Sequence, residues 1–472
     1  MISHICRAAS RWIFFATLAY APWAYGATTS ASIQITNWLL LAAFVLWAVE
    51  LLVSGRTPRF PRLLFFLAAA LVCVGGWMVF NARSIYDTDF SVFVPLRNFA
   101  PLLPGSVDYT ISAAWIIRGT LLLGTVLFVA DLSQSNRWLL RLWYAIALVA
   151  GSIAFLGLLQ KATGAQMILW QPPPPEEGLR VSTFFATYYY HGNAGAFLNL
   201  VWPLSAGLVI RAFSSRSHPG MRAVWICSFI VTIAAVLANT SRMSQILALL
   251  LLFAICMQFG PALLRELSGS KKSVALAGGL AILLALIALA QAVHLEQPLK
   301  RWQIESQRIS GDARWRAFHV AMGAVPDARL CGFGPGTFRV VFSWYNDGSA
   351  NQAPGIWRFL HDDYIQTVLE WGLLGSSLWA LLFFGGIAIG IRSYHRHGRA
   401  WAPRRHVLQP LVIMALVGVA LHALVDFPFQ IESIQLYVAT YLGICWGSAL
   451  WRDARSALHS QSSFVRCERA NA

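Results

Sequence analysis

Uninterrupted apolar runs recur along the whole of this 472-residue sequence and restrict what the chain can fold into. The run ILALLLLFAI at residues 246–255 is typical of them. A helix needs roughly 17–25 apolar residues to cross a bilayer core of about 30 Å. Lipid offers the backbone no hydrogen-bond partners, so a span is a helix or part of a closed barrel, whose strands would alternate apolar and polar residues. The sequence therefore predicts an all-α polytopic integral membrane protein in contact with membrane lipids.

The composition agrees with this class, because 57% of the residues are hydrophobic and only 12% are charged. Twelve spans are predicted, at roughly 11–26, 35–54, 63–80, 110–130, 138–160, 189–210, 222–239, 243–260, 274–293, 364–391, 407–424 and 433–450. This divides the chain into four parts. Residues 1–293 contain nine spans, residues 294–363 form a large outer loop, residues 364–451 contain three spans, and residues 452–472 form a tail. The first run, RWIFFATLAYAPWAYGATTSA, also fits a signal peptide.

The loops between the predicted spans divide by charge. One alternate set carries arginine and lysine with almost no acids, for example Arg392 and Arg396. The positive-inside rule places this set, and with it both termini, in the cytoplasm. The other set holds the long loops 81–109, 161–188 and 294–363, which face outward. The same rule accounts for the net charge of +16, and no basic motif interleaved with aromatic residues indicates a nucleic-acid partner.

Metal ligation has little support in the sequence. The seven cysteines form no CxxC pair and no disulfide framework. The adjacent Asp362 and Asp363 resemble a metal-binding acidic pair, but adjacent side chains on a helix diverge by about 100°. We therefore expect no metal and no cofactor.

His361 lies at the outer lip of the predicted span 364–391, in the segment HDDYIQTVLEWGLLG. A histidine, with a pKa near about 6.5, suits a general base at neutral pH. Asp362 or Asp363 would orient the imidazole or raise its pKa. The alternative is that His361 only caps the helix or belongs to an interfacial network.

Two further outer segments place arginines near the membrane. Arg242 lies in the first turn of the predicted span 243–260, where a positive charge opposes the helix dipole unless an anion binds there. Arg180 precedes an unusually polar span entry that contains His191 and Asn193. This pattern favours a site, although Arg180 alone also fits an interfacial arginine whose charged head reaches water.

The large outer loop contains RISGDARWRAFHVAMGAVPDARLCGFGPGTF. Residues 312–324 have helical spacing, with Arg314 beside an apolar face predicted to comprise Ala313, Trp315, Phe318, Ala321 and Met322. The glycines at 332, 334 and 336 predict a tight loop whose backbone amides face an anion.

Three charged residues in or beside the predicted spans leave alternatives open. Arg118 lies about 12 Å into its span at 1.5 Å per residue, where it meets either a lipid phosphate or a structural partner. Asp426, in HALVDFPFQ, is predicted to anchor Arg242 or Arg314 in an ion pair. Glu370 is predicted to pair with an arginine.

Several arginines and a histidine at one membrane face indicate phosphate recognition, because the guanidinium fork matches phosphate oxygens. Sugars linked to polyprenyl pyrophosphate are the leading candidates for a lipid-attached phosphate on the outer face. Five segments, in this order, resemble the bacterial O-antigen ligase/polymerase family: GLRVSTFFATYYYHGNAGAFLNLVWPL, NTSRMSQILALL, SGDARWRAFHVAMGAVPDARLCGFGPGTF, HDDYIQTVLEWGLLG and HALVDFPFQ. The resemblance covers roughly residues 175–440.

The resemblance implies a GT-C-like glycosyltransferase of the bacterial inner membrane with its active site at the periplasmic face. Ligases of this family transfer a glycan from undecaprenyl pyrophosphate to a sugar hydroxyl of lipid A–core, without metal and with inversion. By position in the motifs, Arg180, Arg242 and Arg314 correspond to the pyrophosphate-binding arginines and His361 to the base. Asp362 replaces an asparagine that is common in the family.

Other functions remain open at this stage. An O-antigen polymerase or a protein O-oligosaccharyltransferase would share these motifs and differ in its acceptor. A lipid-linked glycan flippase would need a charged path through the membrane, whereas the arginines are predicted at one face.

Overall fold

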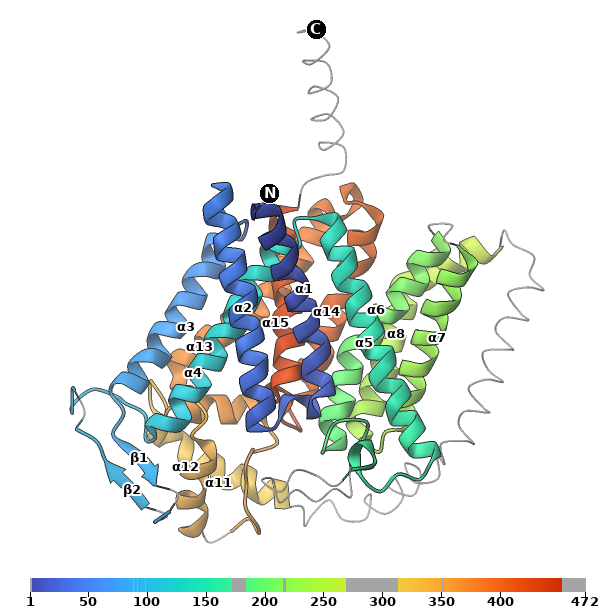
Figure 1. Cartoon of the computed structure of the whole chain (residues 1–472). Helices are drawn as coiled ribbons and strands as arrows, with labels where there is room; N and C mark the ends of the chain where they lie inside the picture. Colours follow the sequence, from blue (N-terminus) through green and yellow to red (C-terminus); the bar gives the residue numbers. More distant parts are fainter. Residues whose placement is uncertain are drawn as a thin grey trace.

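The computed structural model describes residues 2–171, 184–214, 218–268, 313–349 and 352–451, apart from single positions 88, 91 and 98. Most of these residues are helical (Figure 1). The long helices are α1 (Ile2–Trp23), α2 (Ser30–Ser54), α3 (Arg62–Phe80), α4 (Tyr109–Leu132), α5 (Asn136–Ala162), α6 (His191–Ser214), α7 (Pro219–Ala238), α8 (Arg242–Ser268), α13 (Asp363–His397), α14 (Pro403–His422) and α15 (Glu432–Gly447).

Nine helices in the described part of the chain are long and apolar enough to cross a membrane, namely α2 to α8, α13 and α14. This agrees with an all-α polytopic membrane protein. Helices α1 and α15 overlap the first and last predicted spans, and α1 begins nine residues before the predicted start at residue 11. The predicted span 274–293 lies outside the described residues, so the count of twelve and the GT-C-like fold stay predictions.

Helix α15 lies inside the bundle and is buried over nearly its whole length (Figure 1). Its tyrosines satisfy their hydroxyls by reaching backbone carbonyls of neighbouring helices. Tyr437 donates to the carbonyl of Leu18 in α1 at 3.0 Å, and Tyr441 donates to Leu200 in α6 at 3.0 Å. Because an unpaired buried hydroxyl is costly, these bonds fix α15 against both helices.

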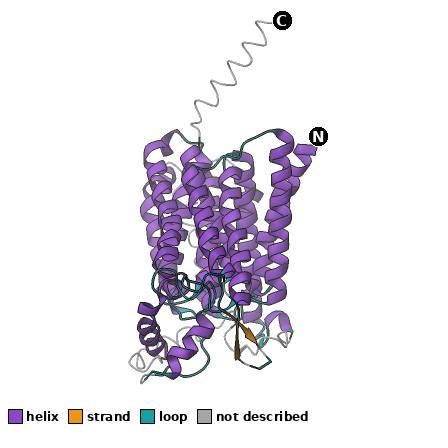
Figure 2. Ribbon diagram, turned by 90° about the vertical axis from the view of Figure 1, so that its left-hand side faces the viewer, coloured by secondary structure: helices purple, strands orange, loops and turns teal. Residues whose placement is uncertain are grey.

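A layer of shorter elements covers one end of the bundle (Figures 1 and 2). It contains the antiparallel hairpin of β1 (Ser84–Asp87) and β2 (Val92–Pro95), in which Ser84 pairs with Pro95. It also contains α11 (Ala313–Ala328) and α12 (Phe338–Asp347), so the large loop is partly helical. This layer has its own small apolar core, which includes Ala321, Phe342 and Leu360.

The predicted apolar face of α11 is only partly right. Ala321 is fully buried, but Trp315 and Met322 are exposed. The buried face instead comprises Ala317, Val320, Ala321, Ala324 and Ala328. Small alanines face the layer because α11 packs closely against α13 and α12.

Helix α13 is broken at Gly372, which has φ 61° and ψ −168°. The break frees backbone groups, and the segment 329–334 binds them. Phe333 N–H donates to Leu369 O at 2.8 Å and Gly334 N–H donates to Glu370 O at 3.0 Å. Beyond the break, two N–H groups of α13 donate to the same segment. Leu373 N–H donates to Arg329 O, and Leu374 N–H donates to Leu330 O. The outer layer is thus bonded to the helix break.

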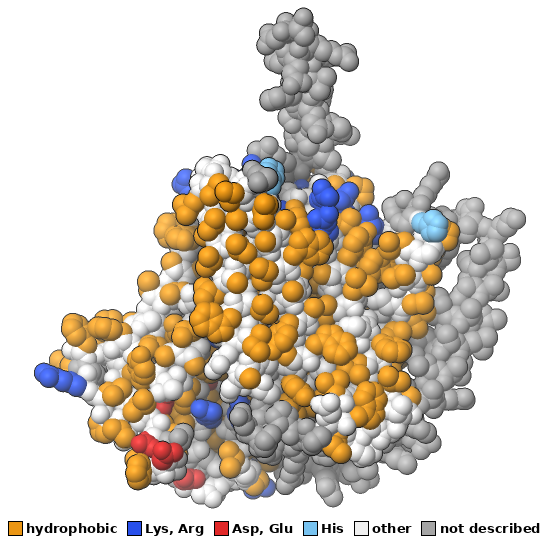
Figure 3. Space-filling view, viewed as in Figure 1, with side chains coloured by type: hydrophobic (Ala, Val, Ile, Leu, Met, Phe, Trp, Pro, Cys, Tyr) orange, Lys and Arg blue, Asp and Glu red, His pale blue; other side chains and the backbone are white. Residues whose placement is uncertain are grey.

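Charge also differs between the two ends. On the face shown in Figure 3, hydrophobic side chains cover the middle of the bundle. A cluster of lysine and arginine side chains gathers near the end where α1 begins, whereas the end with the outer layer shows the visible acidic side chains together with further lysine and arginine side chains. At the α1 end, Arg56 binds two carboxylates, Glu50 at 2.9 Å and Asp131 at 2.6 Å.

Candidate active site

His361 and Asp426 form the centre of the candidate site. Nδ1 of His361 lies 3.0 Å from Oδ1 of Asp426. An ionised carboxylate only accepts hydrogen bonds, so the imidazole donates from Nδ1, which leaves Nε2 as its basic nitrogen. His361 has φ 63°, a strained left-handed conformation for a non-glycine residue, held directly before the first turn of α13. The backbone therefore fixes the direction of this imidazole.

Aromatic rings surround the imidazole. Phe427 contacts it edge-on with ring centroids 4.6 Å apart, and Tyr190 and Trp357 each lie 6.0 Å from it. Tyr190 also stacks on Phe427 at 5.4 Å. The side chain of His361 remains 19% exposed. The rings restrict its rotation while one edge stays accessible.

Asp426 lies in the connection between α14 and α15 and is 5% exposed. Burial alone would raise the pKa of this carboxyl, but His361 and His422 lower it, so the pKa lies well below its ordinary value. His422 Nε2 is 3.7 Å from Oδ2, and the N–H of Phe427 donates to Oδ1 at 3.1 Å. Gly192 at the start of α6 closes the remaining side, since a Cβ there would come within 2.3 Å of Oδ2.

Arg314 reaches this centre from α11. Its Nη2 donates to the hydroxyl of Tyr190 at 3.1 Å. Burial raises the pKa of Tyr190 and so does the negative charge of Asp426, while Arg314 lowers it. Tyr190 therefore connects the predicted arginine to the His361–Asp426 pair.

Asp362 and Asp363 have other partners than the imidazole. Asp362 caps α13 by accepting from the N–H groups of Tyr364 and Ile365, each at 3.0 Å, and burial raises its pKa. Asp363 accepts from Phe429 N–H at 2.7 Å and from Gln430 at 2.8 Å. The prediction that one of them orients His361 is wrong, because Asp426 does so.

The two predicted ion pairs of acidic residues also differ in the structure. Asp426 was expected to anchor an arginine, but its ion-pair partners in the described chain are histidines. Glu370 was expected to pair with an arginine, but it accepts from the N–H of Gly336 at 3.0 Å, of Phe338 at 3.4 Å and from Gln366 at 3.0 Å. The glycine loop does present an amide to an acidic group, and this group is the carboxyl of the protein's own Glu370.

Arg118 has structural partners at its predicted depth in α4. It donates to the carbonyl of Gln430 at 2.9 Å, lies 3.6 Å from Glu432 and stacks over Trp115 at 4.6 Å. It is 6% exposed. Of the two predicted alternatives, the structural pairing is present.

The remaining predicted residues lie beside the centre. His191, whose ring contacts Tyr190 at 4.7 Å, and Asn193 are buried in the first turn of α6. Asn239, just before α8, donates to the carbonyl of His191 at 2.9 Å. This bond holds the turn before α8 against the start of α6. Arg242, the first residue of α8, is half-buried there. Arg180 lies outside the described residues.

Sequence reasoning missed the roles of Tyr190 and His422. A signal for His422 was present, because His422 and Asp426 are four residues apart in the sequence, with His422 ending α14 and Asp426 in the connection that follows. No comparable signal identifies Tyr190. Among the residues the structure describes, no group of three His, Cys, Asp or Glu side chains is placed to hold a metal ion.

Residues 227–380 match the model of a family described as O-antigen ligase. This stretch contains Arg242, Arg314 and His361, whereas Asp426 lies beyond it. No curated protein matches the chain. The family match over this stretch bears out the resemblance found in the sequence motifs and supports membership of the O-antigen ligase family.

Proposed function

We propose that this protein is an O-antigen ligase that transfers a glycan from undecaprenyl pyrophosphate to a sugar hydroxyl of lipid A–core. The observation that carries the proposal is the His361–Asp426 pair, held at 3.0 Å beside Tyr190 and Arg314. The pair supplies a base, and the arginine supplies a cation for phosphate. A base and a cation at one place are what glycosyl transfer from a pyrophosphate requires.

The chemistry is a single displacement at C1 of the donor sugar. The acceptor oxygen forms a bond to C1, and the bond from C1 to the pyrophosphate oxygen breaks with its electron pair. The acceptor proton passes to Nε2 of His361, and Asp426 stabilises the resulting imidazolium through Nδ1. Attack from the face opposite the leaving group inverts the anomeric centre, and no metal is needed.

Arginines stabilise the charge that grows on the leaving pyrophosphate. Arg314 is held near the base by Tyr190. Arg242 begins α8, where its charge and the positive end of the helix dipole both favour an anion. We assign Arg180 to the same role from its motif. Removing one such donor typically costs about 10²–10³ in rate.

The orientation follows from the charge distribution. The basic cluster near the start of α1 would face the cytoplasm by the positive-inside rule, and the outer layer with His361 would face the periplasm (Figure 3). Both termini would then be cytoplasmic, and the membrane would be the bacterial inner membrane. Donor and acceptor would meet at the periplasmic face.

Complementation of a ligase-null strain tests the proposal. The wild-type chain should restore the ladder of O-antigen on lipopolysaccharide gels, and His361→Ala at equal membrane level should not. His319→Ala is the matched control, because His319 is an exposed histidine of α11 in the same layer. Full activity of His361→Ala would exclude His361 as the base.

The same gels distinguish the acceptor. The strain must supply a compatible donor and core. If the polymer stays attached to its lipid carrier when the wild-type chain is present, the protein is not an O-antigen ligase. Restored chain length in a polymerase-null strain would instead indicate an O-antigen polymerase. Glycan on a pilin-type protein would indicate a protein O-oligosaccharyltransferase.

A further inference from the structure

An exposed apolar segment, FAPLLP at residues 99–104, follows the β1–β2 hairpin of the outer layer. Phe99 is 74% exposed, Leu102 is 99% exposed, and Leu103 is exposed as well. All six residues have apolar side chains. Exposed apolar side chains that gather in this way mark a surface that contacts another molecule or a membrane.

Helix α3 fixes the position of this segment relative to the membrane. The 19 residues of α3 are apolar enough to cross a bilayer, and the helix is about 28 Å long at 1.5 Å per residue, close to the hydrocarbon thickness of about 30 Å. Its last residue, Phe80, therefore lies near the edge of the hydrocarbon core. Phe80 is exposed, and its ring centroid lies 5.3 Å from that of Phe99. The FAPLLP segment thus begins at the membrane edge.

Trp77 marks the same edge of the membrane. Its ring lies 6.1 Å from that of Phe80, and its indole N–H donates to Pro104 O at 3.1 Å. Tryptophan is enriched where membrane meets water, because its ring is apolar and its N–H is polar. Both ends of the FAPLLP segment therefore contact the end of α3, through Phe80 at Phe99 and through Trp77 at Pro104.

Asn81, the residue after α3, holds the backbone of the segment. Its side chain is fully buried. Oδ1 accepts from Ala100 N–H at 2.8 Å, and Nδ2 lies 3.0 Å from Ala100 O. The same nitrogen lies 3.1 Å from the carbonyl oxygens of Leu103 and Pro104. The backbone is thus bonded to the end of α3 while the side chain of Leu102 faces outward.

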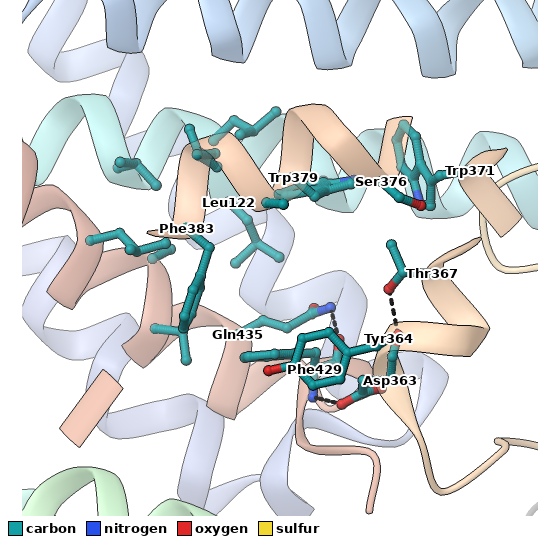
Figure 4. A pocket seen from close by; sticks show the side chains of 18 of the residues that line it. Leu122, Asp363, Tyr364, Thr367, Trp371, Ser376, Trp379, Phe383, Phe429 and Gln435 are labelled. Atoms are coloured by element: carbon teal, nitrogen blue, oxygen red, sulfur yellow. Dashed lines mark hydrogen bonds between the residues drawn. The ribbon is translucent and has the colours of Figure 1, made fainter. Parts of the chain in front are cut away.

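The segment is also connected to the glycine loop and to the break in α13. Val107, three residues after the segment, donates its N–H to Phe333 O at 2.9 Å. In α3, Gly75 packs so closely on Trp371 that a Cβ would lie 3.0 Å from the ring. Trp371 directly precedes the break at Gly372 and lines the apolar cavity between α4, α13 and α15 that Figure 4 shows. The FAPLLP segment, the glycine loop and the break are therefore held at fixed positions relative to one another.

We propose that the FAPLLP segment is an interfacial anchor, which lies among the lipid headgroups and upper acyl chains on the side of the bilayer that carries the outer layer. A lipid surface is the partner that continuity favours, because the segment extends the exposed apolar surface of α3 beyond Phe80. Arg97, exposed two residues before the segment, suits contact with lipid phosphates. The anchor would set the depth of the outer layer in the membrane, whatever reaction the protein catalyses.

Photocrosslinking of the full-length protein in nanodiscs of phosphatidylethanolamine and phosphatidylglycerol tests the proposal. The photoreactive amino acid p-benzoylphenylalanine is placed at position 102, 66 or 89, and lipid adducts are measured by intact mass. Phe66 is an exposed residue within α3 and is the positive control. Asp89, an exposed acid after β1 in the same hairpin, is the matched control for water. Lipid adducts should form at positions 102 and 66 and should be absent at position 89.

Two asparagines supply a matched pair of variants. Asn346 of α12 makes the same two-way contact with Ala353, accepting from its N–H at 2.8 Å and donating to its carbonyl at 3.0 Å. Asn81→Ala should lower the adduct yield at position 102 severalfold, because the segment loses its backbone partner. Asn346→Ala should leave this yield unchanged.

The anchor is excluded if position 66 reacts with lipid and position 102 does not, or if positions 102 and 89 react equally. Crosslinking of position 102 to a second copy of the chain would show a protein interface in its place. An unchanged yield in Asn81→Ala would overturn the role of Asn81. None of these readouts requires glycan transfer, so they do not depend on the proposed function.

Discussion

The imidazole of His361 and the carboxylate of Asp426 are 65 residues apart in the chain and 3.0 Å apart in space. This contact selects the tautomer of the imidazole and, in the proposed reaction, would stabilise its protonated form. Asp426→Asn removes the negative charge, and the new side-chain amide can turn either its oxygen or its NH2 group toward Nδ1 of His361. We expect transfer to fall by about 10²–10⁴.

The measurement is the rate of glycan transfer to lipid A–core in membranes, at matched protein level. Asp347→Asn serves as the control, because Asp347 is an exposed acid at the end of α12. A rate for Asp426→Asn within about twofold of the wild type would show that the carboxylate does not support the base.

His422 is expected to act as a positioning residue on the far oxygen of Asp426. It is fully buried, and its Nε2 lies 3.7 Å from Oδ2. His422→Leu leaves that oxygen facing an apolar side chain, so we expect kcat to fall about tenfold with the KM for donor little changed. His422→Gln restores a polar donor and should recover most of the rate. Equal losses in both variants would point to a packing defect.

The contact between Arg314 and Tyr190 predicts non-additive effects on donor binding. Arg314→Gln and Tyr190→Phe should each raise the KM for donor, and the double variant should be little worse than Arg314→Gln. We expect a coupling of about 1 kcal/mol from the double-mutant cycle. Arg316→Gln, an exposed arginine on the same helix, is the control. Fully additive effects would mean that Tyr190 does not position Arg314.

Gly336 is expected to be irreplaceable in the outer layer. It has φ 75°, and a Cβ there would lie 2.0 Å from Trp115. Gly336→Ala combines backbone strain with this clash and should destabilise the fold by more than about 3 kcal/mol. Gly355→Ala, where φ is 88° and nothing lies within 4 Å, tests strain alone and should cost about 1 kcal/mol. Thermal unfolding in detergent measures both, and similar losses would contradict the clash.

The helices were predictable because bilayer crossing imposes long apolar runs. Helix α4, for example, spans Tyr109–Leu132 where residues 110–130 were predicted. The partners of the acids were not predictable. Asp363 and Glu370 bind backbone amides of the connection before α15 and of the glycine loop, and such contacts depend on tertiary packing. The predicted buried face of α11 was wrong for a similar reason. Its apolar side chain predicted that Trp315 is buried, whereas the close approach of neighbouring helices places small alanines on the buried face.

The break in α13 at Gly372 gives the outer layer a mechanical role. Four backbone hydrogen bonds join the segment 329–334 to the two sides of the break, and a straight helix would need some of the same groups for itself. The outer layer cannot separate from α13 unless all four hydrogen bonds break. Likewise, α13 cannot become straight at Gly372 unless its bonds to the outer layer break. A displacement of the segment 329–334 would therefore also move the turn of α13 that begins beside His361.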